Sequence, residues 1–96
     1  MPKSKTPSYF EVGPHKVKIT FKEYLADDHR GLSDFANGTV AVEKPKGATD
    51  TYVDQTLWHE ITHWILEVMG EEKLNRDEKF VDLFGSLICQ VLRTLK

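Results

Sequence analysis

Two histidines and a glutamate stand together in the segment His59-Glu60-Ile61-Thr62-His63. Residues four apart lie on one face of an α-helix, so both imidazoles can reach a single ion at the ~2.0–2.1 Å of a zinc–nitrogen bond. Glu60 projects beside that face, where a carboxylate can take a proton from water that a metal activates. The spacing therefore predicts one Zn²⁺ per chain, bound by His59 and His63, with Glu60 as general base. The plain alternative is two ordinary histidines and a solvated carboxylate.

Catalytic zinc needs a third protein ligand and an open fourth position. Five carboxylates follow the motif and are candidates: Glu71, Glu72, Asp77, Glu78 and Asp82. Glu78 and Asp82 share a helix face, where two carboxylates repel unless each has a partner. We predict that Glu78 binds the metal and that Asp82 accepts a ring N–H from a ligating histidine. Alternatively, Asn75-x-x-Glu78 is a capping box, in which Glu78 folds back onto the backbone.

The motif needs a helix to position it, and the surrounding residues predict one. That helix begins near Thr49 or Asp50 and ends at Met69, because Gly70 is a natural stop. One apolar stripe runs along it: Val53, Leu57, Ile61, Trp64 and Val68. The two histidines point roughly opposite this stripe, so packing into a core does not explain them.

A last helix is expected from after Asn75 to about Leu95. Its broad apolar face consists of Phe80, Phe84, Leu87, Val91 and Leu95, with Val81, Ile88 and Leu92. Gly85 lies on the same row as Glu78 and Asp82. Its missing side chain would let the two helices approach closely and bring the carboxylates to the metal.

The first half of the chain has short β-like runs. Strands are expected at Tyr9–Val12, Lys16–Phe21 and Thr39–Glu43, and residues 25–38 read as a long loop. The predicted fold is α+β: a small antiparallel sheet packed on two helices, with the zinc site between the helices. Residues 1–7 are expected to be a flexible tail and residues 8–96 a single domain.

Composition narrows the class of protein. The chain has 96 residues, a net charge of −2 and one cysteine, Cys89. The charge gives no case for binding nucleic acid, no apolar run approaches the ~20 residues that span a bilayer, and the N-terminus lacks the apolar core of a signal peptide. We expect a cytoplasmic protein, and an inert Cys89 on an apolar helix face. A domain this small without disulfides often gains stability from a metal or a partner.

The motif HExxH on one helix, with Glu78 and then Asp82 on the next, resembles the gluzincin metallopeptidases. The short sheet, the length and the phrase from Thr56 to Leu66 are similar to their smallest members, the minigluzincins and the ImmA/IrrE-like peptidases. The resemblance covers roughly residues 38–92. It implies zinc, peptide hydrolysis with Glu60 as base, and an edge strand that aligns the substrate, here Thr39, Val40, Ala41, Val42 and Glu43. The spacing from His63 to Glu78 is shorter than in larger relatives.

The expected function is therefore that of a zinc-dependent endopeptidase acting on a peptide or protein. The rival from another class is a non-catalytic, zinc-stabilised protein-binding module, and a third interpretation is a metal-free helical domain. Structural zinc sites usually have four protein ligands rich in cysteine, which argues against the binding module. The group that would steady the oxyanion stays open among Tyr9, Tyr24, Tyr52, His15, His29 and Arg76.

Overall fold

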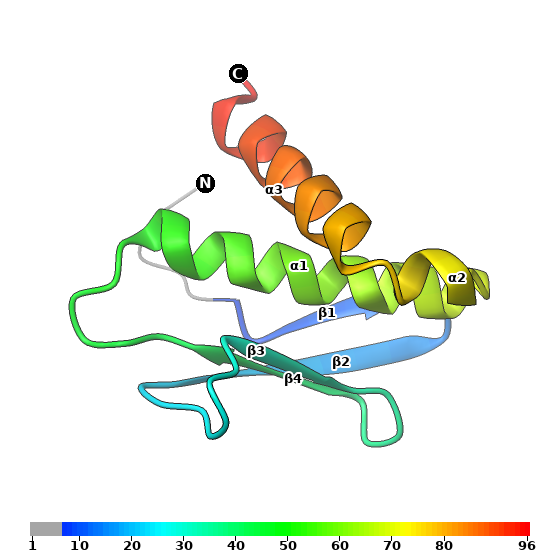
Figure 1. Cartoon of the computed structure of the whole chain (residues 1–96), viewed down its shortest axis with the longest axis horizontal. Helices are drawn as coiled ribbons and strands as arrows, with labels where there is room; N and C mark the ends of the chain where they lie inside the picture. The colour runs from blue at the N-terminus through cyan, green and yellow to red at the C-terminus, as the bar shows by residue number, and fades with distance from the viewer. Residues whose placement is uncertain (1–6) are drawn as a thin grey trace.

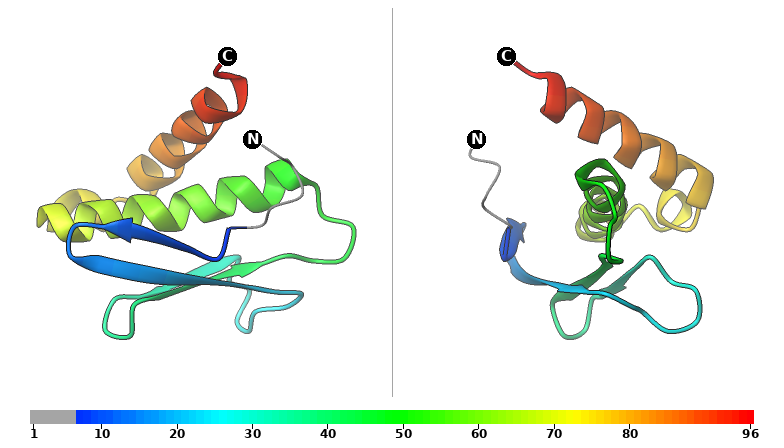
Figure 2. Two further views of the ribbon diagram at one scale, coloured as in Figure 1. Left: turned by 180° about the vertical axis from the view of Figure 1, so that it is seen from behind. Right: turned by 90° about the vertical axis from the view of Figure 1, so that its left-hand side faces the viewer.

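The computed structural model describes residues 7–96, so the expected tail, residues 1–7, lies outside the described residues except for Pro7. The described residues form four strands and three helices. These are β1 (Tyr9–Val12), β2 (His15–Lys22), β3 (Gly31–Asp34), β4 (Thr39–Glu43), α1 (Asp50–Met69), α2 (Glu72–Asn75) and α3 (Glu78–Thr94). The sheet is covered on one face by α1, and α3 crosses α1 on the side away from the sheet (Figures 1 and 2). The predicted α+β fold is confirmed.

The sheet is mixed, not wholly antiparallel as expected. Its strand order is β1-β2-β4-β3, in which β1 and β3 pair antiparallel with their neighbours while β2 and β4 run parallel. The loop expected at residues 25–38 contains β3, which forms a hairpin with β4. Val40 and Val42 of β4 have no exposed surface, so β4 takes an interior position, and the shorter, more polar β3 takes the edge.

This order corrects the expected edge strand. Thr39–Glu43 is paired on both sides and cannot receive a substrate strand, whereas β3 stands at the end of the sheet. The sequence gives a strand's polarity pattern but not its neighbours. An apolar strand is stabilised more by two flanking strands than by an exposed edge, which is the physical reason for the difference.

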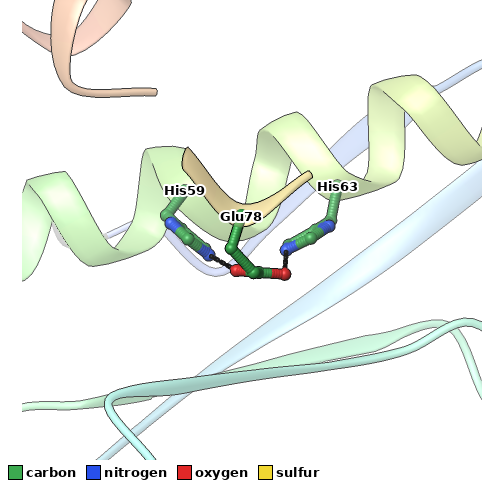
Figure 3. A group of neighbouring side chains, drawn as sticks. All are labelled: His59, His63 and Glu78. Carbon is green, nitrogen blue, oxygen red and sulfur yellow. Dashed lines mark ion pairs between the residues drawn. The ribbon is translucent and has the colours of Figure 1, made fainter. Parts of the chain in front are cut away.

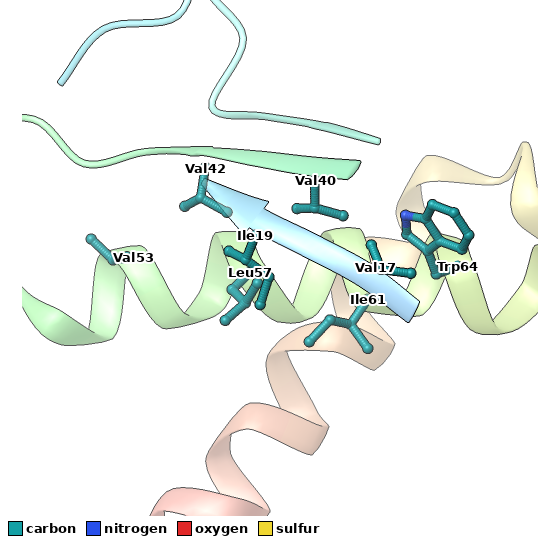
Figure 4. Packing of buried hydrophobic residues seen from close by; sticks show 8 residues of the cluster. All are labelled: Val17, Ile19, Val40, Val42, Val53, Leu57, Ile61 and Trp64. Atoms are coloured by element: carbon teal, nitrogen blue, oxygen red, sulfur yellow. The ribbon is translucent and has the colours of Figure 1, made fainter. Parts of the chain in front are cut away.

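The core lies between the sheet and α1 (Figure 4). Alternate residues of the two central strands point to one face, and they meet the apolar stripe of α1. The cluster consists of Val17, Ile19, Val40, Val42, Val53, Leu57, Ile61 and Trp64. Because this stripe turns α1 toward the sheet, the opposite side of the helix faces α3.

Caps define both long helices. The Thr49 hydroxyl accepts a hydrogen bond from the Tyr52 N–H at 3.1 Å, and Gly70 ends α1 in the left-handed region with φ 76°. The Asp77 carboxylate caps α3 by accepting from the Phe80 N–H at 3.1 Å. Asp77 is therefore the cap of α3, and the Asn75–Glu78 capping box that the sequence left open is not what begins this helix. The connection between the long helices also holds the short α2, which was not predicted.

The two long helices meet closely at Gly85. A Cβ atom at this position would lie 3.0 Å from the backbone nitrogen and 3.1 Å from the Cα of His59. Val81 and Cys89, one turn on either side, are buried with it. The expected role of Gly85 in helix approach is confirmed. Among residues 7–96, no helix combines the length and the apolar character that crossing a membrane requires.

Candidate metal centre

His59, His63 and Glu78 converge on one point between α1 and α3 (Figure 3). The Nε2 atom of His59 lies 3.2 Å from Oε1 of Glu78, and the Nε2 atom of His63 lies 3.3 Å from Oε2 of the same carboxylate. One ligand atom from each residue lies within 4.8 Å of the other two. The side chain that was predicted as third ligand is thus the one that meets both histidines.

This geometry fits a metal site. Two ligands held at ~2.0–2.1 Å in a tetrahedral arrangement stand about 3.3 Å apart, close to the two nitrogen–oxygen distances here. Side-chain exposure is 22% for His59 and 16% for His63 but 68% for Glu78, so both histidines are largely covered and the group opens to solvent at its carboxylate. His59, His63 and Glu78 could therefore hold a metal ion.

The outer nitrogens of the two rings have partners of their own. Nδ1 of His59 lies 3.4 Å from Oδ1 of Asp82, the neighbour that the sequence suggested, and Nδ1 of His63 lies 2.6 Å from Oδ1 of Asn75. A proton on Nδ1 lets each ring donate to these oxygens and leaves both Nε2 atoms directed at the common point. Ring orientation is thus set from outside the cluster.

Asn75 was missed as a histidine partner. The sequence offered it only as a helix cap, because its contact with His63 depends on the short α2, which turns its side chain back toward α1. Of the other candidate ligands, Asp77 caps α3, while Glu71 and Glu72 lie at the start of α2.

Glu60 is not one of the three converging residues. It is only 6% exposed, and its Oε1 atom accepts a hydrogen bond from the Ser33 hydroxyl at 2.7 Å. Gly31 backs onto it, since a Cβ there would come within 2.9 Å of the Glu60 Cγ atom. Both contacts come from β3. Ser33 and Gly31 were therefore also missed, because their segment was read as a loop.

A cleft of about 320 Å³ adjoins Glu60 and His59. It is lined by Asp28, His29, Arg30, Gly31, Gln55, Thr56, His59, Glu60, Asp82 and Ser86. The Arg30 guanidinium lies 4.2 Å from the centre of the Tyr52 ring, which fixes a cation near one end of the cleft. His29 is one of the residues left open for oxyanion binding, and it reaches the cleft. Glu60, His59 and the edge strand β3 thus border the same space.

The pKa values of two groups outside the cluster of His59, His63 and Glu78 are shifted. Burial raises the pKa of the Cys89 thiol, and the Asp54 carboxylate adds to this effect, which favours the protonated thiol at neutral pH. A hydrogen bond from the Asn37 side chain, followed by one from its backbone N–H, lowers the pKa of Asp34. The resulting charged turn joins β3 to β4 and helps to hold the edge strand.

Comparisons of the chain with protein-family models, with curated proteins and with solved structures return no match.

Proposed function

We propose that this chain is a zinc-dependent endopeptidase. One observation carries the proposal: two helix-borne imidazoles and a carboxylate converge within 4.8 Å, next to a glutamate that is buried yet borders a cleft. Two histidines, one carboxylate and an open position are a common ligand set of catalytic zinc. A purely structural zinc site has no use for a carboxylate in the place of Glu60.

When bound, zinc would polarise the scissile carbonyl and increase the acidity of the attacking water. His59, His63 and Glu78 would hold it. The contacts of Asp82 and Asn75 orient both imidazole rings for metal binding. Glu60 takes the proton from the attacking water on one carboxylate oxygen and passes it to the leaving amine. Ser33 holds the other oxygen and so fixes the direction of the carboxylate.

The substrate is proposed to bind in extended form along β3. This strand ends the sheet order, so one of its edges carries no neighbouring strand among residues 7–96. A peptide can pair with such an edge through backbone hydrogen bonds. β3 also places Gly31 and Ser33 against Glu60, so a peptide on this edge would pass beside the general base. The role assigned by resemblance to Thr39–Glu43 belongs in this proposal to β3.

Metal analysis is the first test. After dialysis without chelator, the protein should retain close to one equivalent of zinc, and the His59→Ala/His63→Ala variant should retain none. Glu78→Gln should lose affinity sharply, because a neutral amide oxygen is a poor zinc ligand. The control is Glu72→Gln, which changes an exposed carboxylate on α2. Wild-type zinc content in the double histidine variant would contradict the assigned ligands.

Glu60→Gln separates an enzyme from a binding module. This variant keeps the size of the side chain and its contact with Ser33 but removes its basicity. It should fold, retain zinc and still bind its substrate, while cleavage falls by at least ~100-fold, since a positioned base contributes ~10²–10⁴-fold. Partners captured on the variant are the substrates to assay. Equal cleavage by both forms would remove Glu60 as base, and partners that wild type binds but never cuts would favour a binding module.

A further inference from the structure

Most of the apolar face predicted for the last helix is not used by the fold, although Val81 is buried. Besides Leu92, which lies next to the buried row of this helix, five large apolar side chains of α3 and its C-cap remain between 44% and 72% exposed: Leu83, Phe84, Leu87, Val91 and Leu95. We call these five residues the α3 stripe. The buried positions of α3, which are Val81, Gly85 and Cys89, form a separate row that faces α1. The views in Figures 1 and 2 show α3 leaving α1 toward its C-terminal end, so nothing in the described chain covers the stripe there.

The stripe is large for a surface that stays in water. An aromatic side chain buries ~150–250 Å² and a large aliphatic one somewhat less, so five such side chains at about half exposure offer on the order of 500 Å². The largest apolar patch of a typical monomer is ~300–600 Å², and each partner in a stable interface contributes about 800 Å². The stripe therefore lies near the upper limit for a monomer, and with a polar rim it approaches what an interface requires.

The spacing of the stripe suits a second copy of the same helix. Phe80, which stacks on Phe84 with ring centres 5.8 Å apart, extends the stripe toward the start of α3. From there the apolar positions run 80, 84, 87, 91 and 95. The steps of four, three and four from position 80 to position 91 match the seam by which two helices interlock side chains, and Leu95 follows after one further step of four. A seam that is apolar throughout is self-complementary, as a two-fold interface must be.

Charge at the two ends of α3 selects an antiparallel pairing. Residues 77–82 contain three acidic residues and one lysine, while residues 90–96 contain Arg93 and Lys96 and no acidic residue. An antiparallel arrangement places the acidic end of one helix beside the basic end of the other. A parallel arrangement places like charges together and aligns the two helix dipoles unfavourably.

We propose that two copies of this chain associate through the α3 stripe, with the two helices antiparallel and the two-fold axis passing near Leu87. Position 84 of one copy then meets position 91 of the other, and position 80 meets position 95. The interface leaves β3 uncovered, because β3 belongs to the sheet on the opposite side of α1 from α3. Of the residues that line the cleft beside Glu60, only Asp82 and Ser86 come from α3, and neither belongs to the stripe.

Sedimentation equilibrium over a range of concentrations tests the association. The wild-type protein should approach twice the chain mass of 11.0 kDa. Leu87→Glu/Val91→Glu should raise the dimer dissociation constant by at least ~100-fold, because it places charges opposite apolar side chains. Both sites are exposed, so the far-ultraviolet circular dichroism should not change. The matched controls are Tyr24→Glu and Met69→Glu, exposed hydrophobic residues outside the stripe, which should associate as wild type does.

Disulfide trapping tests the direction of the pairing. Under mild oxidation, Leu87→Cys should cross-link to its own copy, and a mixture of Phe84→Cys with Val91→Cys should cross-link more than either variant alone. Buried Cys89 stays in place as an unreactive background. A monomer at the highest soluble concentration would overturn the proposal and leave the stripe to a different partner. A dimer that survives the double glutamate variant, or cross-linking of position 84 mainly to itself, would also overturn it.

Discussion

The two histidines of the centre are held by unlike partners. Asn75 reaches Nδ1 of His63 at 2.6 Å and is a neutral amide, whereas Asp82 lies 3.4 Å from Nδ1 of His59 and carries a charge on an exposed side chain. A charge makes a histidine a stronger donor to metal, but solvent screens it and a longer contact weakens it. The 2.6 Å contact of Asn75 should therefore restrict the His63 ring more strongly than the 3.4 Å contact of Asp82 restricts the His59 ring.

This difference leads to a prediction about metal affinity. Asn75→Ala and Asp82→Asn should both keep zinc but weaken its binding, within the ~10–100-fold cost usual for partners of ligating histidines, and Asn75→Ala should weaken it more. A competition titration with a coloured chelator measures both, with Asp54→Asn as a control on a carboxylate that pairs with Arg93 far along the helices. An Asn75→Ala variant with wild-type zinc affinity would mean that the 2.6 Å contact does not contribute to metal binding.

At the scale of elements, two glycines let α1 be approached from opposite sides. Gly31 brings β3 against Glu60, and Gly85 brings α3 against the backbone of His59. Both contacts would be crowded by a single carbon atom. The positions of Glu60 and of His59 thus depend on close packing of three elements that are far apart in the sequence.

Gly85→Ala tests this packing. Helix propensity alone would stabilise α3 by ~1 kcal/mol, but overpacking costs ~1–3 kcal/mol, and the atoms in the way belong to the rigid backbone of α1. We expect a lower melting temperature and weaker zinc binding, since the helices must separate and carry Glu78 away from both rings. Gln90→Ala, at an exposed site on the same helix, should show neither effect. Gly85→Ala with a raised melting temperature and unchanged zinc affinity would mean that the helices adjust at no cost.

At the scale of the whole molecule, the cluster of His59, His63 and Glu78 lies where α3 contacts the rest of the fold. α3 buries only three residues, Val81, Gly85 and Cys89, against the rest of the chain, and the ligand group lies at the same contact. A metal that binds the folded state alone should therefore add substantially to its stability.

Calorimetry with and without zinc measures that contribution. At free zinc about 100-fold above the dissociation constant, the gain is ~2.7 kcal/mol, which for a chain of this size raises the melting temperature by roughly 10–20 °C. The same addition should leave Glu78→Gln nearly unchanged. An equal shift in that variant would mean that zinc stabilises the protein from another site.

The amino-acid sequence was sufficient for whatever depends on neighbours a few residues away. Helix or strand periodicity predicts the strand at Thr39–Glu43 and the shared face of His59 and His63. The ends of α1 follow from the residue types that cap helices, Thr49 and Gly70. Gly85 could be interpreted because it falls on the same helical row as Glu78. Such local patterns depend only on the order of residues along the chain.

Tertiary structure alone decided which distant segments meet. It paired β2 with β4 in parallel and placed β3 at the edge of the sheet. It also brought together side chains that are distant in the sequence: Ser33 contacts Glu60 across 27 positions, and Asn75 contacts His63 across 12. No periodicity reports these contacts, because they result from competition among strands and side chains for buried space. For the same reason the sequence predicted the apolar face of α3 but not whether the fold covers it, and most of that face stays exposed.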